Sequence, residues 1–509
     1  MDKIAIEILK KRYLLKGETS SKMFRIVAKA VSKGNKKLEM DFFKMMNALD
    51  FLPNSPTLMN AGTKIGQLSA CFVLPINDSI ESIYTTLKNS AKIHQSGGGT
   101  GFNFSNIRPK NDIVKSSKGK ASGPVSFIRL FNASTDIIKQ GGKRRGANMA
   151  LLNINHPDIL EFINAKQHGL FNFNLSVAVT DDFMKRLMKD KNINLINPKD
   201  KKIFKKIKAR RIWNEIINNA WIDGDPGIIF IDEINRKHPI KEKITSTNPC
   251  GEAPLLDYES CVLGSINLSH FVKNGKIDFI KLRKTAHLAV EFLDNVIDVN
   301  KFPLKEIEKK TKENRKIGLG VMGFSEMLIK LGISYNSELA IRLAKNVMNF
   351  INFEARNKSI ELGKRKGSFP NIRKSKFKAM RNATVTTIAP TGTLSLIAET
   401  SSGIEPLFAV KYKRHFDGKM YEIVNKLWKK YPKKLFVTFD KVKLEQHVRI
   451  QAAFQKYTDN AVSKTVNLPN KATKKDVDKI FKLAYESKCK GITVYRYGSK
   501  KGQVICEVC

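Results

Sequence analysis

The 509-residue chain has few cysteines, six in all, and only eight histidines. Cysteines this sparse exclude the disulfide framework of a small secreted protein and favour individual roles in a reducing compartment. Long apolar runs are also lacking, and the first residues carry no signal-peptide stretch. These absences predict a soluble cytoplasmic protein, with no membrane association, whose cysteines are catalytic, metal-binding or buried.

Acidic residues are scarce beside basic ones. The chain has 47 Asp and Glu against 91 Lys and Arg, a formal charge of +44. Such an excess can attract polyanions, including nucleotides and nucleic acid. The basic residues are dispersed, however, and no aromatic-interleaved nucleic-acid motif accompanies them. We therefore interpret the charge as solvated basic surface and do not expect nucleic acid as a partner.

Apolar periodicity predicts helices over residues 3–50, followed by a region in which strands alternate with helices. Strands are predicted at 171–180, 227–232, 383–389 and 491–496, and long amphipathic helices at 279–298 and 337–363. This alternation indicates an α/β architecture with largely parallel pairing. The expected organisation is a helical N-terminal region at 1–52, a catalytic domain at 53–497 and a flexible tail at 498–509.

The segment STNPCGEAPLLDYESCVLGSINL, residues 246–268, gathers several reactive side chains. Asn248, Cys250 and Glu252 alternate along it, so in an extended loop their side chains would point the same way. The proline and glycine between them oppose a helix and favour that loop. An amide, a thiol and a carboxylate aimed at one point could perform nucleophilic or radical chemistry with proton transfer.

Three further motifs allow two interpretations each. Cys506 and Cys509 form C-x-x-C without a second such pair, which favours a redox dithiol over a four-cysteine zinc site. APTGTLS at 389–395 follows a predicted strand and could hold phosphate on backbone N–H groups or merely cap a helix; it lacks the lysine of a P-loop. GLGVMG at 318–323 imitates a dinucleotide fingerprint outside its βαβ context, which favours close backbone packing.

Several blocks follow one another in a familiar order. They are QLSACFVL (67–74), GGGTGFNFSNIRP (97–109), QGGKRRGAN (140–148), PTGTLSLIAETSSGIEP (390–406) and GITVYRYGS (491–499). With the segment around Cys250, they resemble the large, catalytic subunit of ribonucleotide reductases, most closely the adenosylcobalamin-dependent class II enzymes. The resemblance implies a ten-stranded α/β barrel with a central finger loop that carries Cys250.

The resemblance also implies roles for the reactive residues. Cys250 would carry a thiyl radical that removes the 3′ hydrogen of the substrate, while Glu252 accepts the 3′-hydroxyl proton and Asn248 holds the substrate. Cys71, which in its apolar setting could equally be an inert core residue, would join Cys261 in supplying electrons and end as a disulfide. The C-x-x-C tail would reduce that disulfide, with a thioredoxin- or glutaredoxin-like protein as external reductant.

Nucleotide contacts are implied as well. Substrate is expected at Ser55, Ala70, Gly99, Pro390, Thr391, Gly392, Thr393, Leu394 and Ser395. A dNTP or ATP specificity effector is expected at Asp78, Ser79, Ile80 and Arg108. The loop between the two sites would be Gln140, Gly141, Gly142, Lys143, Arg144 and Arg145, although the same residues suit a basic surface turn. The family builds its effector site by dimerisation, so a homodimer is expected.

The radical source is indicated by what the C-terminal blocks lack. Class I subunits carry adjacent tyrosines, whereas Arg496 separates Tyr495 from Tyr497 here, and no glycyl-radical motif of class III is present. Adenosylcobalamin is therefore the implied cofactor, and no protein metal ligands are predicted. The expected activity is reduction of ribonucleoside diphosphates to 2′-deoxyribonucleotides. The alternatives are a class I-type subunit with a radical-generating partner, or a catalytically dead nucleotide- or nucleic-acid-binding protein.

Overall fold

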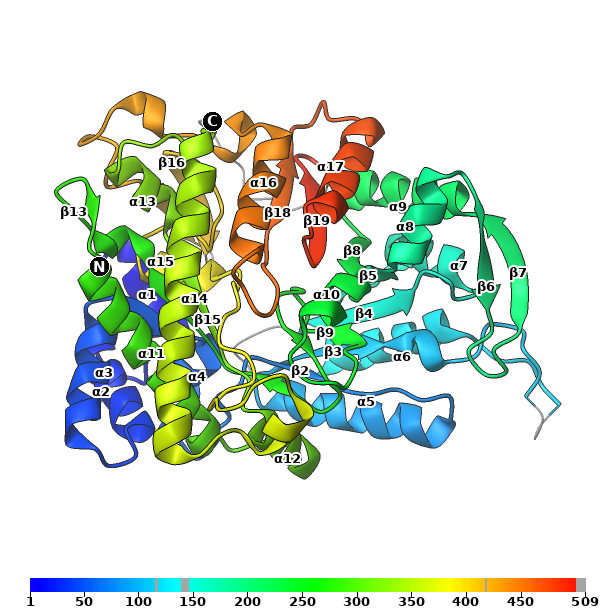
Figure 1. The fold of residues 1–509 in the computed structure, drawn as a ribbon, viewed down its shortest axis with the longest axis horizontal. Coiled ribbons are helices and arrows are strands. Elements are labelled where there is room, and N and C mark those ends of the chain that lie inside the picture. The colour runs from blue at the N-terminus through cyan, green and yellow to red at the C-terminus, as the bar shows by residue number, and fades with distance from the viewer. Residues whose placement is uncertain (115–117, 139–145, 417–418, 500–509) are drawn as a thin grey trace.

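The computed structural model describes residues 1–114, 118–138, 146–416 and 419–499 (Figure 1). The chain begins with three helices, α1 (Lys3–Arg12), α2 (Ser20–Val31) and α3 (Lys36–Asn47), drawn in blue. Thr19 and Asn35 cap the second and third of them by accepting backbone N–H groups. Phe42 packs edge-on against Phe292 of the long helix α11 (Phe279–Val299), with ring centroids 5.0 Å apart. The predicted helical N-terminal region is confirmed.

The first half of the central sheet is entirely parallel. Its strands, in spatial order, are β2 (Cys71–Val73), β3 (Gly99–Asn103), β4 (Asn148–Asn153), β5 (Phe173–Val179) and β8 (Gly227–Phe230). The connecting helices are α5 (Ile80–Gln95), α6 (Pro124–Ile137), α7 (Ile159–Asn164), α8 (Asp181–Met188) and α9 (Ala209–Asp223). Phe102 on β3 contacts Phe131 on α6, with centroids 5.1 Å apart, so these helices cover the outer face of the sheet.

The second half contains five more extended segments. They are β11 (Ser260–Cys261) continued by β12 (Leu263–Asn267), β15 (Gly318–Met322), residues 384–388, residues 461–468 including β18 (Thr465–Leu468), and β19 (Gly491–Arg496). Parallel bridges from Leu319 to Thr386 and from Ile388 to Val462 join the middle segments. Helices of this half are α11, α12 (Lys305–Asn314), α13 (Phe324–Lys330), α14 (Glu338–Lys366), α16 (Leu444–Gln455) and α17 (Lys474–Glu486).

Two antiparallel seams join the halves. β19 pairs with β8 at one seam, and β11 pairs with β2 at the other. The ten segments therefore close into a ring, which confirms the predicted α/β barrel. The short strand β1 (Phe51–Pro53) pairs antiparallel with β12 beside the second seam. Among the described residues, no helix is both long and apolar enough to cross a bilayer.

The GLGVMG motif is a packing element, as its sequence context indicated. It forms β15, and a Cβ added to Gly320 would lie 2.3 Å from the Thr387 carbonyl oxygen. Glycine is therefore needed because the neighbouring backbone approaches too closely for any side chain. The expected helices at 279–298 and 337–363 correspond to α11 and α14, whereas the predicted strand at 383–389 makes only isolated bridges.

A finger loop crosses the inside of the barrel. It is the hairpin of β9 (Ser246–Thr247) and β10 (Pro254–Leu255), with its tip at residues 248–253. Asn174 of β5 donates a side-chain N–H to the Pro249 carbonyl oxygen at 2.8 Å, and the Ala461 N–H donates to the Glu252 carbonyl oxygen at 2.9 Å. Because one partner belongs to each half of the barrel, the tip spans the interior, as predicted.

Replacing Gly101 with alanine tests this crossing. The new methyl group would lie 1.8 Å from the Thr247 carbonyl oxygen, so the finger-loop backbone would have to move. We expect a loss of about 2 kcal/mol in the free energy of unfolding, as for other overpacked interiors. Gly99→Ala is the graded comparison, because its nearest neighbour, at 3.0 Å, is the Pro249 ring. Denaturant unfolding measures both, and equal stability of Gly101→Ala and the unchanged protein would contradict the crossing.

Candidate functional site

Cys71 and Cys261 are directly opposed across the seam between β2 and β11. Opposed residues of an antiparallel pair have Cα atoms about 4.5–5.5 Å apart, a separation that a disulfide can span. Both cysteines are reduced thiols; Cys261 is buried and Cys71 is partly exposed. Burial is the main reason that the pKa of the Cys261 thiol is raised well above its usual value, and the neighbouring Cys71 raises it further. At neutral pH this thiol therefore keeps its proton.

Asn248 connects this cysteine pair to the finger loop. Its side-chain Nδ2 donates to Cys71 Sγ at 3.4 Å, and its Oδ1 accepts the Ala253 N–H at 2.9 Å. The side chain is fully buried. Because both ends of the amide are engaged, Asn248 fixes the position of the loop tip relative to the two sulfurs.

The loop tip is a turn and not the extended loop that its alternation suggested. The Gly251 N–H donates to the Asn248 carbonyl oxygen at 3.1 Å, with Gly251 at φ +77°. Glu252 is buried, and its carboxylate contributes to the raised pKa of Cys261. Cys250, at the apex, is exposed. The turn therefore leaves the Cys250 thiol exposed, while the side chains of Asn248 and Glu252 on either side of it are buried.

Cys250 lines a cavity of about 320 Å³ whose wall includes Asn174, Pro390 and Tyr495. The cavity is bounded by β5, β8 and β19, so it lies where the two barrel halves meet at their β8–β19 seam. A small molecule in it would be in reach of the apical thiol. The structure thus brings Cys71, Cys261, Asn248 and Glu252 together on one side of the loop and leaves Cys250 accessible at the tip.

The predicted phosphate turn precedes a short helix, α15 (Gly392–Ile397). Thr391 adopts a left-handed conformation at φ +54°, and its hydroxyl accepts the Gly403 N–H at 2.8 Å. A Cβ at Gly392 would meet no heavy atom within 4 Å, so there is open space beside the first turn of the helix. Pro390 borders the Cys250 cavity, while Gly392 and Ser395 border a second cavity of about 550 Å³.

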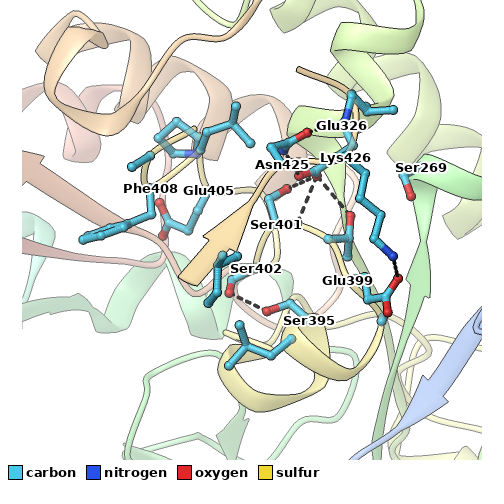
Figure 2. Close-up of a pocket in the computed structure, with 18 of the residues that line it drawn as sticks. Ser269, Glu326, Ser395, Glu399, Ser401, Ser402, Glu405, Phe408, Asn425 and Lys426 are labelled. Carbon is cyan, nitrogen blue, oxygen red and sulfur yellow. Dashed lines mark hydrogen bonds and ion pairs between the residues drawn. The ribbon is translucent and has the colours of Figure 1, made fainter. Parts of the chain in front are cut away.

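Figure 2 shows this second cavity beside α15. Buried Glu326 accepts hydrogen bonds from the Ser401 N–H at 2.9 Å, the Ser401 hydroxyl at 2.6 Å and the Asn425 amide at 3.2 Å. Ser395 and Ser402 hydroxyls lie 2.8 Å apart. These bonds tie the loop after α15 to α13, and so hold the phosphate turn in place.

Two buried charged residues near the site were not predicted from the sequence. Glu326 lies three residues beyond GLGVMG and carried no motif of its own. Lys464 borders the Cys250 cavity, and its fully buried ammonium contacts Glu405 Oε2 at 2.5 Å and His447 Nδ1 at 2.9 Å. Burial lowers the pKa of Lys464, and Glu405 opposes that shift. The only available signal was a lone lysine directly before the strand Thr465–Leu468.

The remaining predicted substrate contacts lie in three places. Ala70 and Gly99 adjoin the cysteine pair, since the Ala70 N–H donates to the Cys261 carbonyl oxygen at 3.3 Å and Gly99 donates to Ala70 at 3.0 Å. The Ser55 hydroxyl lies 2.7 Å from that of Tyr13 on the N-terminal layer. Thr393 and Leu394 lie within α15.

The predicted effector residues lie together at the start of α5. Arg108 Nε pairs with Asp78 Oδ2 at 2.7 Å, and Ser79 caps the helix by accepting the Ser82 N–H at 3.1 Å. Ile80, the first helical residue, is exposed. The predicted loop from Gln140 to Arg145, with Gly141, Gly142, Lys143 and Arg144, and the tail cysteines Cys506 and Cys509, lie outside the described residues.

Two family models match the chain over nearly its whole described length. Residues 69–380 and 373–495 match the ribonucleotide reductase barrel domain, and residues 1–66 match the ribonucleotide reductase all-alpha domain. The chain belongs to the ribonucleotide reductase family. The N-terminal layer and the closed barrel of this reductase chain thus correspond to the two domains that the family models define.

Two relatives of this reductase chain have the same name as each other. The vitamin B12-dependent ribonucleoside-diphosphate reductase of Thermoplasma acidophilum is 54% identical over 504 residues, which cover 91% of this chain and 66% of that protein. The enzyme of that name from Mycobacterium tuberculosis is 43% identical, covering 98% of this chain and 80% of its own length. The ribonucleoside-diphosphate reductase subunit alpha of Chlamydia pneumoniae is 27% identical over 74% of this chain. The chain spans only about two thirds of the Thermoplasma relative.

A buried ion pair supports the reductase seam from behind. Glu259, directly before β11, accepts hydrogen bonds from the Leu256 N–H at 2.7 Å, the Asn314 amide at 2.5 Å and the Lys316 ammonium at 2.6 Å. Both charged side chains are almost fully buried. The carboxylate thereby joins the start of β11 to the residues just before β15.

Glu259→Gln should destabilise the protein by about 3–5 kcal/mol, because it leaves the Lys316 ammonium buried without its counter-charge. Glu308→Gln is the matched control: its partner Lys312 lies at 2.6 Å, but both side chains are exposed, so a loss below about 1 kcal/mol is expected. Denaturant unfolding measures both variants. Similar losses for the two would show that the buried pair does not support the seam.

Thiol labelling should follow the burial of the cysteines. At pH 8, iodoacetamide is expected to alkylate exposed Cys250 before Cys71, and to leave Cys261 and Cys489 unmodified longest. Both protected thiols are buried, and burial raises the pKa of Cys489 to about 12. Mass spectrometry of a time course gives the order, with denatured protein as the control in which every cysteine reacts. Labelling of Cys261 as fast as Cys250 would contradict the described site.

Proposed function

We propose that the chain reduces ribonucleoside diphosphates to 2′-deoxyribonucleoside diphosphates, with adenosylcobalamin as its radical source. The observation that carries this proposal is the opposition of Cys71 and Cys261, joined to the Cys250 loop through Asn248. Replacing a hydroxyl by hydrogen requires a two-electron reductant, which an opposed dithiol supplies. The names of the Thermoplasma and Mycobacterium relatives agree with this activity.

The surroundings of Cys250 fit a radical source that is a bound small molecule. This thiol is the exposed one of the three, and it lines the 320 Å³ cavity. Ser463, Thr493 and Tyr495 of that cavity would contact the part of adenosylcobalamin that reaches the thiol. When bound, the cofactor supplies the radical chemistry that removes the hydrogen atom of the Cys250 thiol.

The chain's own residues would then divide the remaining work. Cys250, as a thiyl radical, removes the 3′ hydrogen atom of the substrate and returns it at the end, while Glu252 accepts the 3′-hydroxyl proton and later gives it back. Cys71 and Cys261 together provide two electrons and two protons, so the 2′-hydroxyl leaves as water and the sulfurs become a disulfide. The raised pKa of Cys261 suits this role because it keeps a proton on this thiol until the reaction needs it. Asn248 holds the loop tip beside the pair.

Nucleotide binding would use the two groups of residues described above. The turn at 390–395 would hold the substrate diphosphate in the open space beside Gly392, with Ser55, Ala70 and Gly99 as further contacts. The effector, a dNTP or ATP, would bind around Asp78 and Arg108, with phosphate contacting the guanidinium whose Nε pairs with Asp78. A homodimer would complete this effector site.

We further propose that the tail thiols re-reduce the cysteine pair, with a thioredoxin- or glutaredoxin-like protein as reductant. Thiols that must return to the reduced state require a reducing compartment, so the proposed location is the cytoplasm. The proposed division of the chain remains a helical region at 1–52, the barrel at 53–497 and the redox tail at 498–509.

Turnover with purified protein tests the proposal. With adenosylcobalamin, a small dithiol and each ribonucleoside diphosphate, we expect deoxyribonucleotide formation without any second protein. Cys250→Ser should lower turnover by about 1000-fold or more, because no other group carries the radical, while nucleotide binding persists. Cys489→Ala, a buried cysteine outside the site, is the control that keeps activity. Turnover by Cys250→Ser, or a need for a radical-generating partner protein, would overturn the proposal.

A further inference from the structure

A third cavity, of about 450 Å³, lies between α14, α16 and the turn from α17 to β19, with the end of α10 (Ile231–Lys237) at its rim. Figure 1 shows α16 and α17 beside each other above the barrel. The cationic side chains that line the cavity are Lys237, Lys345, Arg449, Lys456 and Lys488. Its other lining residues are Ile341, Ala452, Ala453 and Ser487, so no carboxylate faces it among the described residues.

Most of this charge is not neutralised nearby. Arg449 pairs with Glu338, and Lys237 Nζ lies 3.3 Å from Glu233 Oε1. In the part of the chain that the structure describes, the other three lysines of the cavity have no carboxylate within 4.0 Å. Burial lowers the pKa of Lys237, and the charges of Arg236, Lys456 and Lys488 lower it further. The cations are therefore close enough to repel one another.

Lys488 is held in an uncommon backbone conformation. It follows the end of α17 at φ +59°, in the left-handed region. Glycine or asparagine usually occupies such a position, because a side chain there is crowded by its own backbone. The chain instead presents a lysine to the cavity.

We propose that this basic cavity binds a polyphosphate anion, such as the triphosphate of a nucleotide. Several adjacent phosphates carry multiple negative charges, which would neutralise the converging cations. Hydrogen bonds between charged groups of this kind are stronger than those between neutral groups. Ile341 and the two alanines provide an apolar surface beside the cations. An overall excess of lysine does not by itself gather lysines around a cavity. The exposed lysines of β7 (Ile203–Lys208), for example, do not line any of the three cavities described above.

The cavity is separate from both nucleotide sites proposed above, but it adjoins the reactive region. Gln451 of α16 donates its side-chain N–H to the carbonyl oxygens of Gly491 at 2.8 Å and Val462 at 3.3 Å. Both acceptors border the Cys250 cavity. A bound anion would therefore contact the outer side of a helix whose inner side packs on the active cavity.

Calorimetric titration of the full chain with inorganic tripolyphosphate tests the site, with a saturating ribonucleoside diphosphate present to occupy the substrate position. We expect binding that weakens as salt is added. Lys456→Glu with Lys488→Glu should weaken it by about tenfold or more, because two charged contacts become repulsive. Lys205→Glu with Lys206→Glu on β7 is the matched control, since it changes the net charge equally on an exposed strand. This control should alter the affinity by less than about threefold.

Thermal unfolding verifies that both double variants are folded, and Lys456→Gln with Lys488→Gln provides a milder substitution that should also weaken binding. The proposal is overturned if tripolyphosphate does not bind the unchanged protein. Equal weakening by the two glutamate pairs would also overturn it, because binding would then reflect only the overall charge. The titration needs neither cofactor nor turnover, so its outcome is independent of the proposed reductase activity.

Discussion

The antiparallel pairing of β2 with β11 is the contact on which the site depends. It closes one of the two seams of the barrel and places Cys71 opposite Cys261 in the same register. A buried hydroxyl chain secures that register: Ser69 and Ser260 lie 3.0 Å apart, and Ser260 lies 3.1 Å from Thr311. A slip of one residue would send one thiol to the opposite face of the sheet. The pairing of β2 with β11 therefore both closes the barrel and brings the two thiols together.

The finger loop imposes a second constraint, because a polypeptide segment inside a barrel needs both space and hydrogen-bond partners. Glycines on β3 provide the space, and Asn174 and Ala461 provide partners from the two halves. Buried backbone groups without such partners would be costly. The turn at the tip then separates two environments, a buried one around Glu252 and an accessible one around Cys250. The radical source can thus reach an exposed thiol while the carboxylate two residues away stays buried.

Charge is distributed unevenly between the interior and the surface. Around the site, a buried lysine is paired with a carboxylate in each of two places, Lys316 with Glu259 and Lys464 with Glu405. Outside the barrel, basic side chains outnumber the available carboxylates, and one cavity collects several of them. Burial of an unpaired charge is expensive, whereas an exposed one is hydrated, so an excess of lysine is tolerated only at the surface. The same excess is available there for anionic ligands.

Local sequence patterns were enough to predict several elements of the fold and the family. Apolar spacing located α11 and α14, and the glycines of GLGVMG indicated backbone packing, because such features depend on a few neighbouring residues. The blocks around Cys71, Cys250 and the phosphate turn indicated the family, and hence the barrel. The resemblance implied that Cys71 joins Cys261, and strand register places the two residues opposite each other. Tertiary structure alone decided that Lys464 and Glu326 lie beside the site. These features arise from residues far apart in the chain, brought together by strand register and burial, and no local spacing encodes either.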